Sequence, residues 1–247
     1  MNQTKSRMTP RRKGSYGIDA PYLLPVPLVL IALNVAQGII SKTPWPFVAA
    51  ALVVACMGCG LYTSRRGKFV VWGELLDQLN LRGDERILDV GCGRGAVLLL
   101  AAERLTMGRA VGVDLWRRGD QSGNSLQATQ RNAVTEGVAE RVELHTADMT
   151  ALPCHDNSFD VVVSNVAVHN VKGSRVRRKA IEEIVRVLRP GGRLMIADIF
   201  GIREYEEYLI GLGLNSIVRR NLGWRMWWSG PWLATRLVTA TKPAAVE

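Results

Sequence analysis

The alternation of apolar and charged positions divides the chain into two unlike parts. Residues 20–41 and residues 43–64 contain no charged side chain, and Lys42 alone separates them. A helix that crosses a membrane needs about 20 consecutive, mostly apolar residues, so each stretch is long enough to span a bilayer. The short connection at residues 41–44 predicts a tight helical hairpin. Two other interpretations stay open: a cleaved signal peptide followed by soluble chain, or a helical hairpin buried against the rest of the protein.

Charged residues that flank the two stretches predict their orientation. Residues 1–20 are polar and basic, and we expect them to form a disordered or surface-lying tail. Five lysines and arginines precede the first stretch, and Arg65, Arg66 and Lys68 follow the second. Because positive residues stay preferentially on the cytoplasmic side, both ends of a transmembrane hairpin at residues 21–64 are expected in the cytoplasm.

From residue 65 onward, short apolar runs alternate with segments of helical period. Alternating strands and helices of this kind indicate an α/β fold with a parallel sheet covered on both faces. The last two runs, on either side of Ser229-Gly230-Pro231, predict an antiparallel hairpin. Residues 65–247 are therefore expected to form one domain around a doubly wound, mostly parallel, seven-stranded sheet. The strands are expected at residues 86–90, 109–114, 142–146, 159–164, 193–199, 216–225 and 232–241, and the helices at residues 69–82, 96–105, 123–135, 175–188 and 204–212.

Net charge, cysteines and histidines indicate which partners, which redox compartment and which kinds of site to expect. The chain has 247 residues and a net charge of +10, which suits a nucleic acid or an anionic membrane surface. Its four cysteines show no disulfide framework, which favours a reducing compartment. Of its three histidines, His145 is expected within a strand and His155 in a loop, and no set of metal ligands emerges, so no metal site is predicted.

The candidate chemistry begins where the first strand ends in a glycine-rich turn. Gly91, Gly93 and Gly95 follow the strand and open onto a helix, a geometry that lets the backbone approach a nucleotide-like ligand closely. Asp89 precedes these glycines and places a carboxylate beside the ligand. That carboxylate would repel the pyrophosphate of a dinucleotide and suits a cationic group better.

Polar residues also follow the next three strands, and the carboxyl ends of parallel strands are where such sheets bind ligands. Asp114 comes 23 residues after Gly91, at a position suited to accept from both hydroxyls of a ribose. Asp148 and Met149 follow the third strand, and residues 164–170 follow the fourth. Four polar clusters at four consecutive strand ends match the length of one extended nucleoside ligand.

In this order and spacing, the segments resemble the class I S-adenosylmethionine-dependent methyltransferases, whose fold is Rossmann-like. The resemblance covers roughly residues 68–245 and is greatest to the branch that modifies small molecules such as quinone precursors, sterols and arsenite. It implies S-adenosyl-L-methionine as the cofactor. It implies further that Asp89 and the backbone of Gly91, Cys92 and Gly93 hold the methionine end of the cofactor, and that the backbone of Asn165 faces its amino group. In the same way it implies that Asp114 holds the ribose, with Leu115 beside the adenine. Asp148 would accept from the adenine amino group, with Met149 packed on the ring.

His169 is the candidate catalytic residue. The sulfonium of this cofactor is already an activated leaving group, so positioning supplies most of the rate and a base is needed only if the acceptor loses a proton. His169 stands at the mouth of the fourth strand, where a base could reach an acceptor. The alternative is a histidine that only shapes the pocket or binds backbone.

The remaining basic residues favour a membrane over a nucleic acid. Arg219, Arg220 and Arg225 lie among Trp224, Trp227, Trp228 and Trp232, and tryptophan mixed with arginine is typical of a membrane interface. We therefore expect a methyltransferase anchored in the inner or cytoplasmic membrane, with its catalytic domain on the cytoplasmic side. Its expected partners are the membrane and a small, lipophilic acceptor. The alternatives are a methyltransferase of nucleic acid or protein that uses the basic face, and a non-catalytic cofactor-binding membrane protein.

Overall fold

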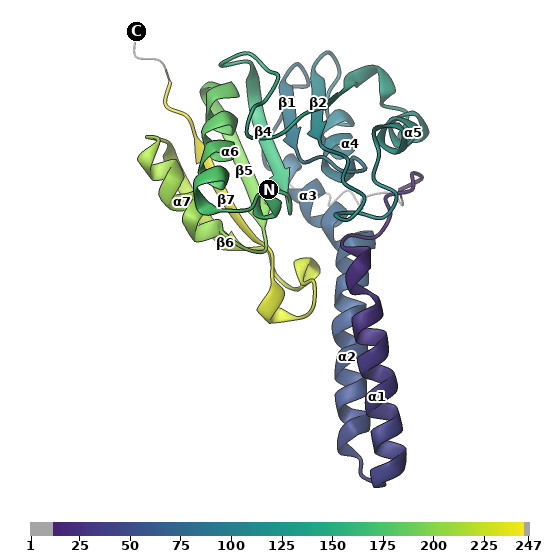
Figure 1. Cartoon of the computed structure of the whole chain (residues 1–247). Coiled ribbons are helices and arrows are strands. Elements are labelled where there is room, and N and C mark those ends of the chain that lie inside the picture. Colours follow the sequence, from purple (N-terminus) through teal and green to yellow (C-terminus); the bar gives the residue numbers. More distant parts are fainter. Residues whose placement is uncertain (1–11, 245–247) are drawn as a thin grey trace, which may run out of the picture.

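The computed structural model describes residues 12–244, and their centre is a single seven-stranded sheet (Figure 1). The strands are β1 (Arg86–Val90), β2 (Arg109–Asp114), β3 (Val142–Thr146), β4 (Phe159–Asn165), β5 (Leu188–Asp198), β6 (Asn215–Asn221) and β7 (Arg236–Thr241). Their order across the sheet is β3-β2-β1-β4-β5-β7-β6. Strands β1 to β5 are parallel, and β7 pairs antiparallel with both β5 and β6. The predicted seven-stranded, mostly parallel sheet with an antiparallel end is confirmed.

Helices cover both faces of this sheet. They are α3 (Lys68–Asp77), α4 (Ala96–Ala102), α5 (Leu126–Glu136), α6 (Ser174–Val187) and α7 (Ile202–Gly211), with short 3-10 turns at Pro21–Leu23, Ala139–Arg141, Val168–Asn170, Trp224–Met226 and Pro231–Leu233. The core has two parts because side chains alternate across the sheet: Val161 and Val163 pack with α3 and α4, whereas Val162 packs with α6 and α7. Both faces of β4 are buried, as a parallel sheet requires.

Several predicted boundaries differ from the observed ones. The expected terminal hairpin is split, because β6 ends at Asn221 and β7 begins at Arg236, and residues 222–235 form a loop with two 3-10 turns. We call this segment the tryptophan loop. The expected helix at residues 69–82 ends at Asp77, and β5 begins already at Leu188, before Pro190. The ends of the strands depend on pairing with neighbouring strands, which local periodicity does not contain.

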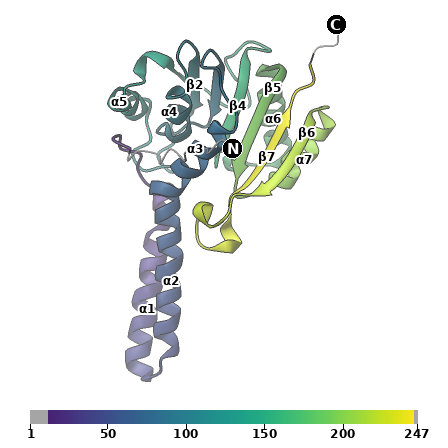
Figure 2. The ribbon, with the colours of Figure 1, turned by 180° about the vertical axis from the view of Figure 1, so that it is seen from behind.

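The two uncharged stretches form a helical hairpin, α1 (Pro25–Ser41) and α2 (Trp45–Tyr62), that projects away from the sheet (Figures 1 and 2). By length and composition, Pro21–Ser41 and Trp45–Asp77 could each cross a membrane, and only 6% and 17% of their apolar windows are buried. A helical hairpin buried against the domain would be mostly covered, so the structure argues against that alternative.

No break separates the hairpin from the domain at residue 64. A π-helical turn, Thr63–Gly67, joins α2 to α3 in one continuous helix, and Thr63, Ser64 and Gly67 are already buried. Tyr62 stacks on Trp224 of the tryptophan loop at a ring-centroid distance of 5.2 Å. The hairpin is therefore fixed to the domain through the π-helical turn and the tryptophan loop.

Residues 12–20, which we call the strap, pack on the domain, whereas the sequence predicted a disordered or surface-lying tail over residues 1–20. Tyr16 is 7% exposed, and its hydroxyl donates to Glu136 of α5 at 2.9 Å. Arg12 pairs with Glu103 at 2.6 Å. Local composition did not reveal these contacts because their partners lie some 90 to 120 positions away. Residues 1–11 of the predicted tail lie outside the described part of the chain.

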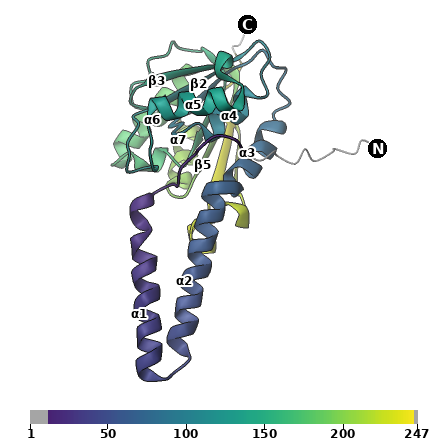
Figure 3. The same ribbon diagram turned by 90° about the vertical axis from the view of Figure 1, so that its right-hand side faces the viewer.

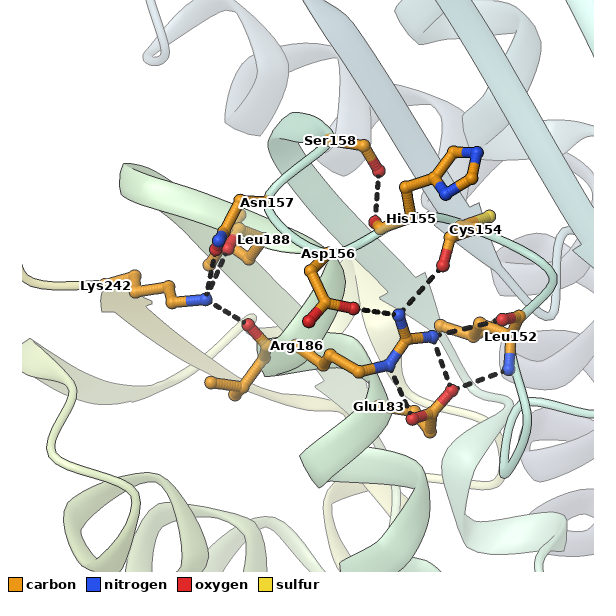
Figure 4. Close-up of polar contacts among 11 residues, drawn as sticks. Leu152, Cys154, His155, Asp156, Asn157, Ser158, Glu183, Arg186, Leu188 and Lys242 are labelled. Carbon is orange, nitrogen blue, oxygen red and sulfur yellow. Dashed lines mark hydrogen bonds and ion pairs between the residues drawn. The ribbon is translucent and has the colours of Figure 1, made fainter.

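Away from the hairpin, Arg186 fixes the loop that leads into β4 (Figure 4). Its guanidinium donates to Glu183 and to Asp156, and also to the carbonyl oxygens of Leu152 and Cys154, at 2.6–3.1 Å. Lys242 holds the same region from the C-terminal side through the carbonyl of Leu188. These contacts set where β4 begins and hence where its other end reaches the candidate site.

Candidate functional site

The glycine-rich turn after β1 has the backbone conformation that only glycine adopts without strain. Gly91, Gly93 and Gly95 have φ angles of +76°, +50° and +85°. A Cβ at Gly91 would lie 2.3 Å from the Cβ of Ala167, and one at Gly93 would lie 2.8 Å from Oε1 of Gln121. The turn is therefore closely packed by its neighbours, and a side chain at Gly91 or Gly93 would collide with them.

Asp89 is a buried carboxylate with one unpartnered oxygen. It is 2% exposed, and Oδ1 has no hydrogen-bond partner among the described residues. Burial raises the pKa of Asp89 to about 8, and the nearby charge of Asp114 adds to the shift. A carboxylate in this position would gain most from a cationic ligand, because a positive charge would offset the cost of its burial.

Asp114 and Asp148 end β2 and follow β3. Asp114 already accepts from the backbone N–H groups of Gly93 at 2.8 Å and Trp116 at 2.5 Å, and burial raises its pKa. Asp148 accepts from the backbone and the hydroxyl of Thr150 through one oxygen, Oδ1, and these bonds lower its pKa. Both side chains are thus held in fixed orientations, and Oδ2 of Asp148 makes no hydrogen bond within the described chain.

The predicted site residues line two adjoining cavities. A cavity of about 420 Å³ is lined on one side by Asp114, Leu115, Asp148 and Met149. A larger cavity of about 930 Å³ is lined by Asp89, Cys92, Gly93, Asn165 and His169, and Gly91 and Asp114 line both cavities. Every residue that the sequence proposed for the site therefore lies along one continuous pair of cavities at the carboxyl ends of the strands.

Two of these residues have side chains engaged within the protein. Oδ1 of Asn165 accepts from Nε1 of Trp72 at 2.8 Å. A Cβ at Gly112 would lie 2.8 Å from Sγ of Cys92, so this thiol packs against β2. Burial raises the pKa of Cys92 well above its ordinary value, which keeps it a neutral thiol. Roles for Asn165 and Cys92 through their backbone, as expected from the sequence, are compatible with these contacts.

The end of β4 turns sharply into the larger cavity. Val166 has a φ of +52°, an unfavourable conformation for a β-branched residue, and its N–H donates to the carbonyl of Ala197 at 2.8 Å. The reversal brings the 3-10 turn Val168–Asn170 to the cavity wall. Strain of this kind is found where the surrounding structure holds a functional residue in place.

His169 is oriented by Asp198, which sequence reasoning did not identify. Nδ1 of His169 lies 2.6 Å from Oδ1 of Asp198, and the backbone N–H of His169 donates to Oδ2 at 3.0 Å. Asp198 is fully buried at the end of β5 and also accepts from Ile199 and from the Tyr205 hydroxyl. The short contact of Nδ1 with Oδ1 places a carboxylate beside Nδ1, so a proton on Nδ1 would be favoured, and Nε2 would then carry the free lone pair. Asp198 could have been sought in the sequence as an acid near the end of a fifth parallel strand.

The strap forms part of the larger cavity and is linked to the glycine-rich turn. Asp19 accepts from Lys68 at 2.7 Å, from Ser64 at 2.6 Å and from Nε2 of Gln121 at 2.9 Å. Oε1 of Gln121 in turn accepts from the backbone N–H of Arg94 at 2.8 Å. Lys68 is 2% exposed, so its ammonium depends on the Asp19 carboxylate for compensation.

The same larger cavity extends along the hairpin, which the sequence did not suggest. Its polar residues lie at the sheet end, and its other end is apolar. We call this apolar end the hairpin groove; it is lined by Val26, Pro27 and Leu30 of α1 and by Val53, Cys56 and Met57 of α2. In Figure 3 the two helices meet at their connection and separate toward the domain. Trp228 and Trp232 of the tryptophan loop form a further wall.

No group of three or more potential metal-ligating side chains (His, Cys, Asp or Glu) is found within residues 12–244.

Comparisons with known proteins give the same reading of the sheet region. Residues 88–196 match a family model described as a methyltransferase domain. The ubiquinone/menaquinone biosynthesis C-methyltransferase UbiE of Roseobacter denitrificans is 33% identical over 129 residues, which are 52% of this chain and 48% of that protein. The sterol 4-C-methyltransferase strm-1 of Caenorhabditis elegans is 29% identical over 133 residues, 54% of this chain and 36% of that protein. This chain thus spans about half or less of these curated relatives.

Solved structures share the fold. The YcgJ protein of Bacillus subtilis superposes with a TM-score of 0.57 at 18% identity, over 71% of this chain and 99% of that one. A geranyl diphosphate methyltransferase in complex with S-adenosylmethionine superposes with a TM-score of 0.56 at 17% identity, over 69% of this chain and 84% of that one. At these identities the likeness concerns the fold of the sheet and its helices.

Proposed function

We propose that this protein, which carries an S-adenosylmethionine-dependent methyltransferase domain, transfers a methyl group from that cofactor to a small lipophilic acceptor at a membrane. The observation that carries the proposal is the buried, unpartnered carboxylate of Asp89 beneath the glycine-rich turn, in the same cavity as the oriented imidazole of His169. Asp89 suits a cationic cofactor, and His169 suits an acceptor that loses a proton.

The residues present fit the cofactor. Asp89 and the backbone at Gly91 and Gly93 would hold its cationic methionine end. In the smaller cavity, Asp114 would bind the ribose, and Asp148 would accept from the adenine amino group through the oxygen that Thr150 leaves free. The bound cofactor supplies a methyl group on a positively charged sulfur that needs no further activation.

His169 would act on the acceptor. Nε2 would take the proton of an acceptor hydroxyl, amine or acidic C–H as the acceptor atom bonds to the methyl carbon, whose bond to sulfur would break with S-adenosylhomocysteine as the neutral leaving group. Asp198 would hold the imidazole in the required tautomer and stabilise the imidazolium that results, as a positioning residue. Phe200, whose ring lies edge-on to His169 at 6.1 Å, would limit water at this point.

A lipophilic acceptor is supported by the lining of the cavity and by the relatives. The hairpin groove is apolar, and the named relatives act on a quinone precursor and a sterol. A nucleic acid is less favoured because several exposed or partly exposed arginines pair with carboxylates of the protein itself: Arg177 with Glu204, Arg178 with Glu182, and Arg225 with Glu74.

Membrane anchoring is supported by the exposed apolar surface of the hairpin. Leu33, Ile39 and Phe47 are 44–65% exposed on helices long enough to span a bilayer. Arg65 and Arg66 are exposed at the junction with the domain, where cytoplasmic positive charge would stand. The catalytic domain would then lie on the cytoplasmic face.

Methyl transfer can be measured directly. The detergent-solubilised full chain is incubated with methyl-labelled S-adenosylmethionine and a membrane lipid extract, and the label is followed into the organic phase. We expect labelled lipid product with the wild type and with Asp84→Asn, an exposed carboxylate outside the site, and at least about a hundredfold less with Asp89→Asn. Label that enters protein or nucleic acid, and no lipid, would contradict the proposed acceptor class.

A further inference from the structure

The larger cavity has two chemically different ends, and their separation constrains the acceptor. Asp89, Asn165 and His169 stand at the sheet end, whereas the hairpin groove presents only apolar side chains and the Cys56 thiol. The adenine and ribose would occupy the smaller cavity, so most of the 930 Å³ is left for the acceptor. That volume is near the upper end of the range for small-molecule sites.

The groove is long and opens sideways. The lining of the larger cavity on α2 runs from Leu52 to Leu61 along one helical face, about 13 Å at a rise of 1.5 Å per residue. Leu30 and Leu52 line the cavity and yet are 44% and 62% exposed, so the groove communicates with the surroundings of the hairpin. On a different side, the cavity is covered by Ile18 and Asp19 of the strap.

We infer that the acceptor is an amphiphile with one polar head and one long, linear apolar chain, which enters laterally from the bilayer. The head lies against His169, and the chain lies in the hairpin groove between α1 and α2. This inference rests on the proposed function and adds the shape of the substrate and its route. Cys56 and Met57 of α2 would then lie against the chain.

The groove does not suit the other occupant that a membrane offers, a two-chain phospholipid. Such a lipid carries a phosphate, and Lys68, the one lysine or arginine among the residues that line the cavity, is already paired to Asp19, which leaves the carboxylates of Asp114 and Asp120 to face the phosphate. A phosphate among these carboxylates would be repelled. An uncharged or protonatable head, such as a phenol, has no such penalty.

Photolabelling of the full chain in phosphatidylcholine vesicles tests the inference without methyl transfer. The probe is a long-chain alkylphenol with a diazirine at the end of its chain, compared with its ethyl analogue and with a diazirine-bearing phosphatidylcholine. We expect the long-chain phenol to label the residues that line the hairpin groove and the ethyl analogue to leave them unlabelled. We expect the phospholipid to label outward positions such as Leu33 and Val48, which are 61% and 48% exposed.

A matched pair of variants on α2 gives the control. Cys56→Trp fills the groove, whereas Val54→Trp, two positions away, introduces the same side chain at a residue that is 48% exposed and outside the cavity. Cys56→Trp is expected to reduce groove labelling about tenfold or more, because several methylene contacts are lost, and to leave affinity for S-adenosylmethionine unchanged. Val54→Trp is expected to leave both unchanged.

The outcomes separate the inference from the proposed function. Equal labelling of the hairpin groove by the phenol and the phospholipid, or equal effects of the two tryptophan variants, would overturn the inference that the acceptor's chain lies in this groove. This holds even if methyl transfer to lipid is observed. Groove labelling as expected, without any methyl transfer into the lipid extract, would overturn the proposed function and leave a binding site for a single-chain amphiphile.

Discussion

At the scale of single residues, the ionisation of the buried carboxyl of Asp89 opposes folding. Without a cation, Asp89 has a pKa of about 8, whereas a carboxyl in an unfolded chain has a pKa near 4. Between these values the folded state binds the extra proton, so the unfolding free energy decreases as the pH rises through this range. A bound cation would remove this penalty, so the group couples stability to cofactor binding.

Asp89→Asn is therefore expected to change stability and cofactor affinity in opposite directions. The cofactor-free variant should have a higher Tm than the wild type at pH 8, by about 3 °C or more, and the difference should shrink toward pH 5. Its affinity for S-adenosylmethionine should fall at least about tenfold at pH 8. Thermal unfolding measures the Tm, and calorimetric titration measures the affinity for S-adenosylmethionine. A variant that is less stable than the wild type at pH 8 would mean that the carboxylate is a structural acceptor.

The pair of His169 and Asp198 makes a second residue-scale prediction. His169→Ala should reduce turnover by about 10² to 10⁴ and abolish its pH dependence, while the affinity for S-adenosylmethionine stays unchanged. Asp198→Asn should keep the pH dependence in altered form and lose less activity, because it disturbs the imidazole without removing it. Initial rates across pH with the lipid product as readout check both. Full turnover by His169→Ala at every pH would show that His169 is not the catalytic base.

At the scale of elements, the hairpin is joined to the domain by close backbone contact. A Cβ at Gly67 would lie 1.9 Å from the carbonyl oxygen of Arg225, and one at Gly60 would lie 2.5 Å from that of Trp228. The hydroxyl of Thr63 donates to the carbonyl of Trp227 at 2.6 Å. The continuous helix and the tryptophan loop thus approach each other at positions where only glycine fits.

Gly67→Ala is expected to separate these two elements. The added methyl group has no space, so we expect a loss of about 1–3 kcal/mol, seen as a decrease in Tm of about 3–10 °C. Gly58→Ala is the control on α2, because a Cβ there would have no heavy atom of another described residue within 4 Å beyond its own helix and chain neighbours. Thermal unfolding followed by tryptophan fluorescence reports the result. Equal Tm values for both variants would show that the contact at Gly67 is dispensable.

Elements and site were not equally predictable from the sequence. Strands β2 and β3 were expected at their observed bounds, because apolar runs flanked by polar residues are a local signal. Asp89 and Asp114 could be identified because the glycine-rich turn and its spacing are also local. Asp198 was missed because it meets His169 only through the pairing of β4 with β5. The hairpin groove was missed because hydropathy treats every apolar position on a helix alike.

The tryptophans show the same limit. The sequence favoured a membrane interface for those in residues 224–232, with part of them forming protein core or a cavity wall. In the structure Trp224 and Trp232 are 60% and 72% exposed, and Trp228 donates from Nε1 to Thr235 at 2.9 Å. Trp228 and Trp232 line the larger cavity. One short loop combines exposed aromatic surface and cavity wall, and only the fold of residues 222–235 separates the two uses.

At the scale of the whole molecule, the proposed anchoring makes a prediction about extraction. The hairpin is uncharged over most of its length, so its retention in membranes should not depend on ionic strength. We expect the full chain to stay in the membrane pellet both in about 1 M salt and in alkaline carbonate, and to enter solution only with detergent. Release by salt alone would indicate attachment through basic residues. Release by carbonate would contradict a spanning hairpin.

The strap sets an order of events for the folding of the whole chain. Residues 12–20 leave the ribosome before any of the domain that they bind, and their partners Gln121, Asn132 and Glu136 follow more than 100 residues later. By that time α1 and α2 have already been synthesised. The strap can therefore complete its contacts only after α5 has been synthesised, so this wall of the larger cavity is held by contacts between one of the first parts of the chain to be made and a segment made more than 100 residues later.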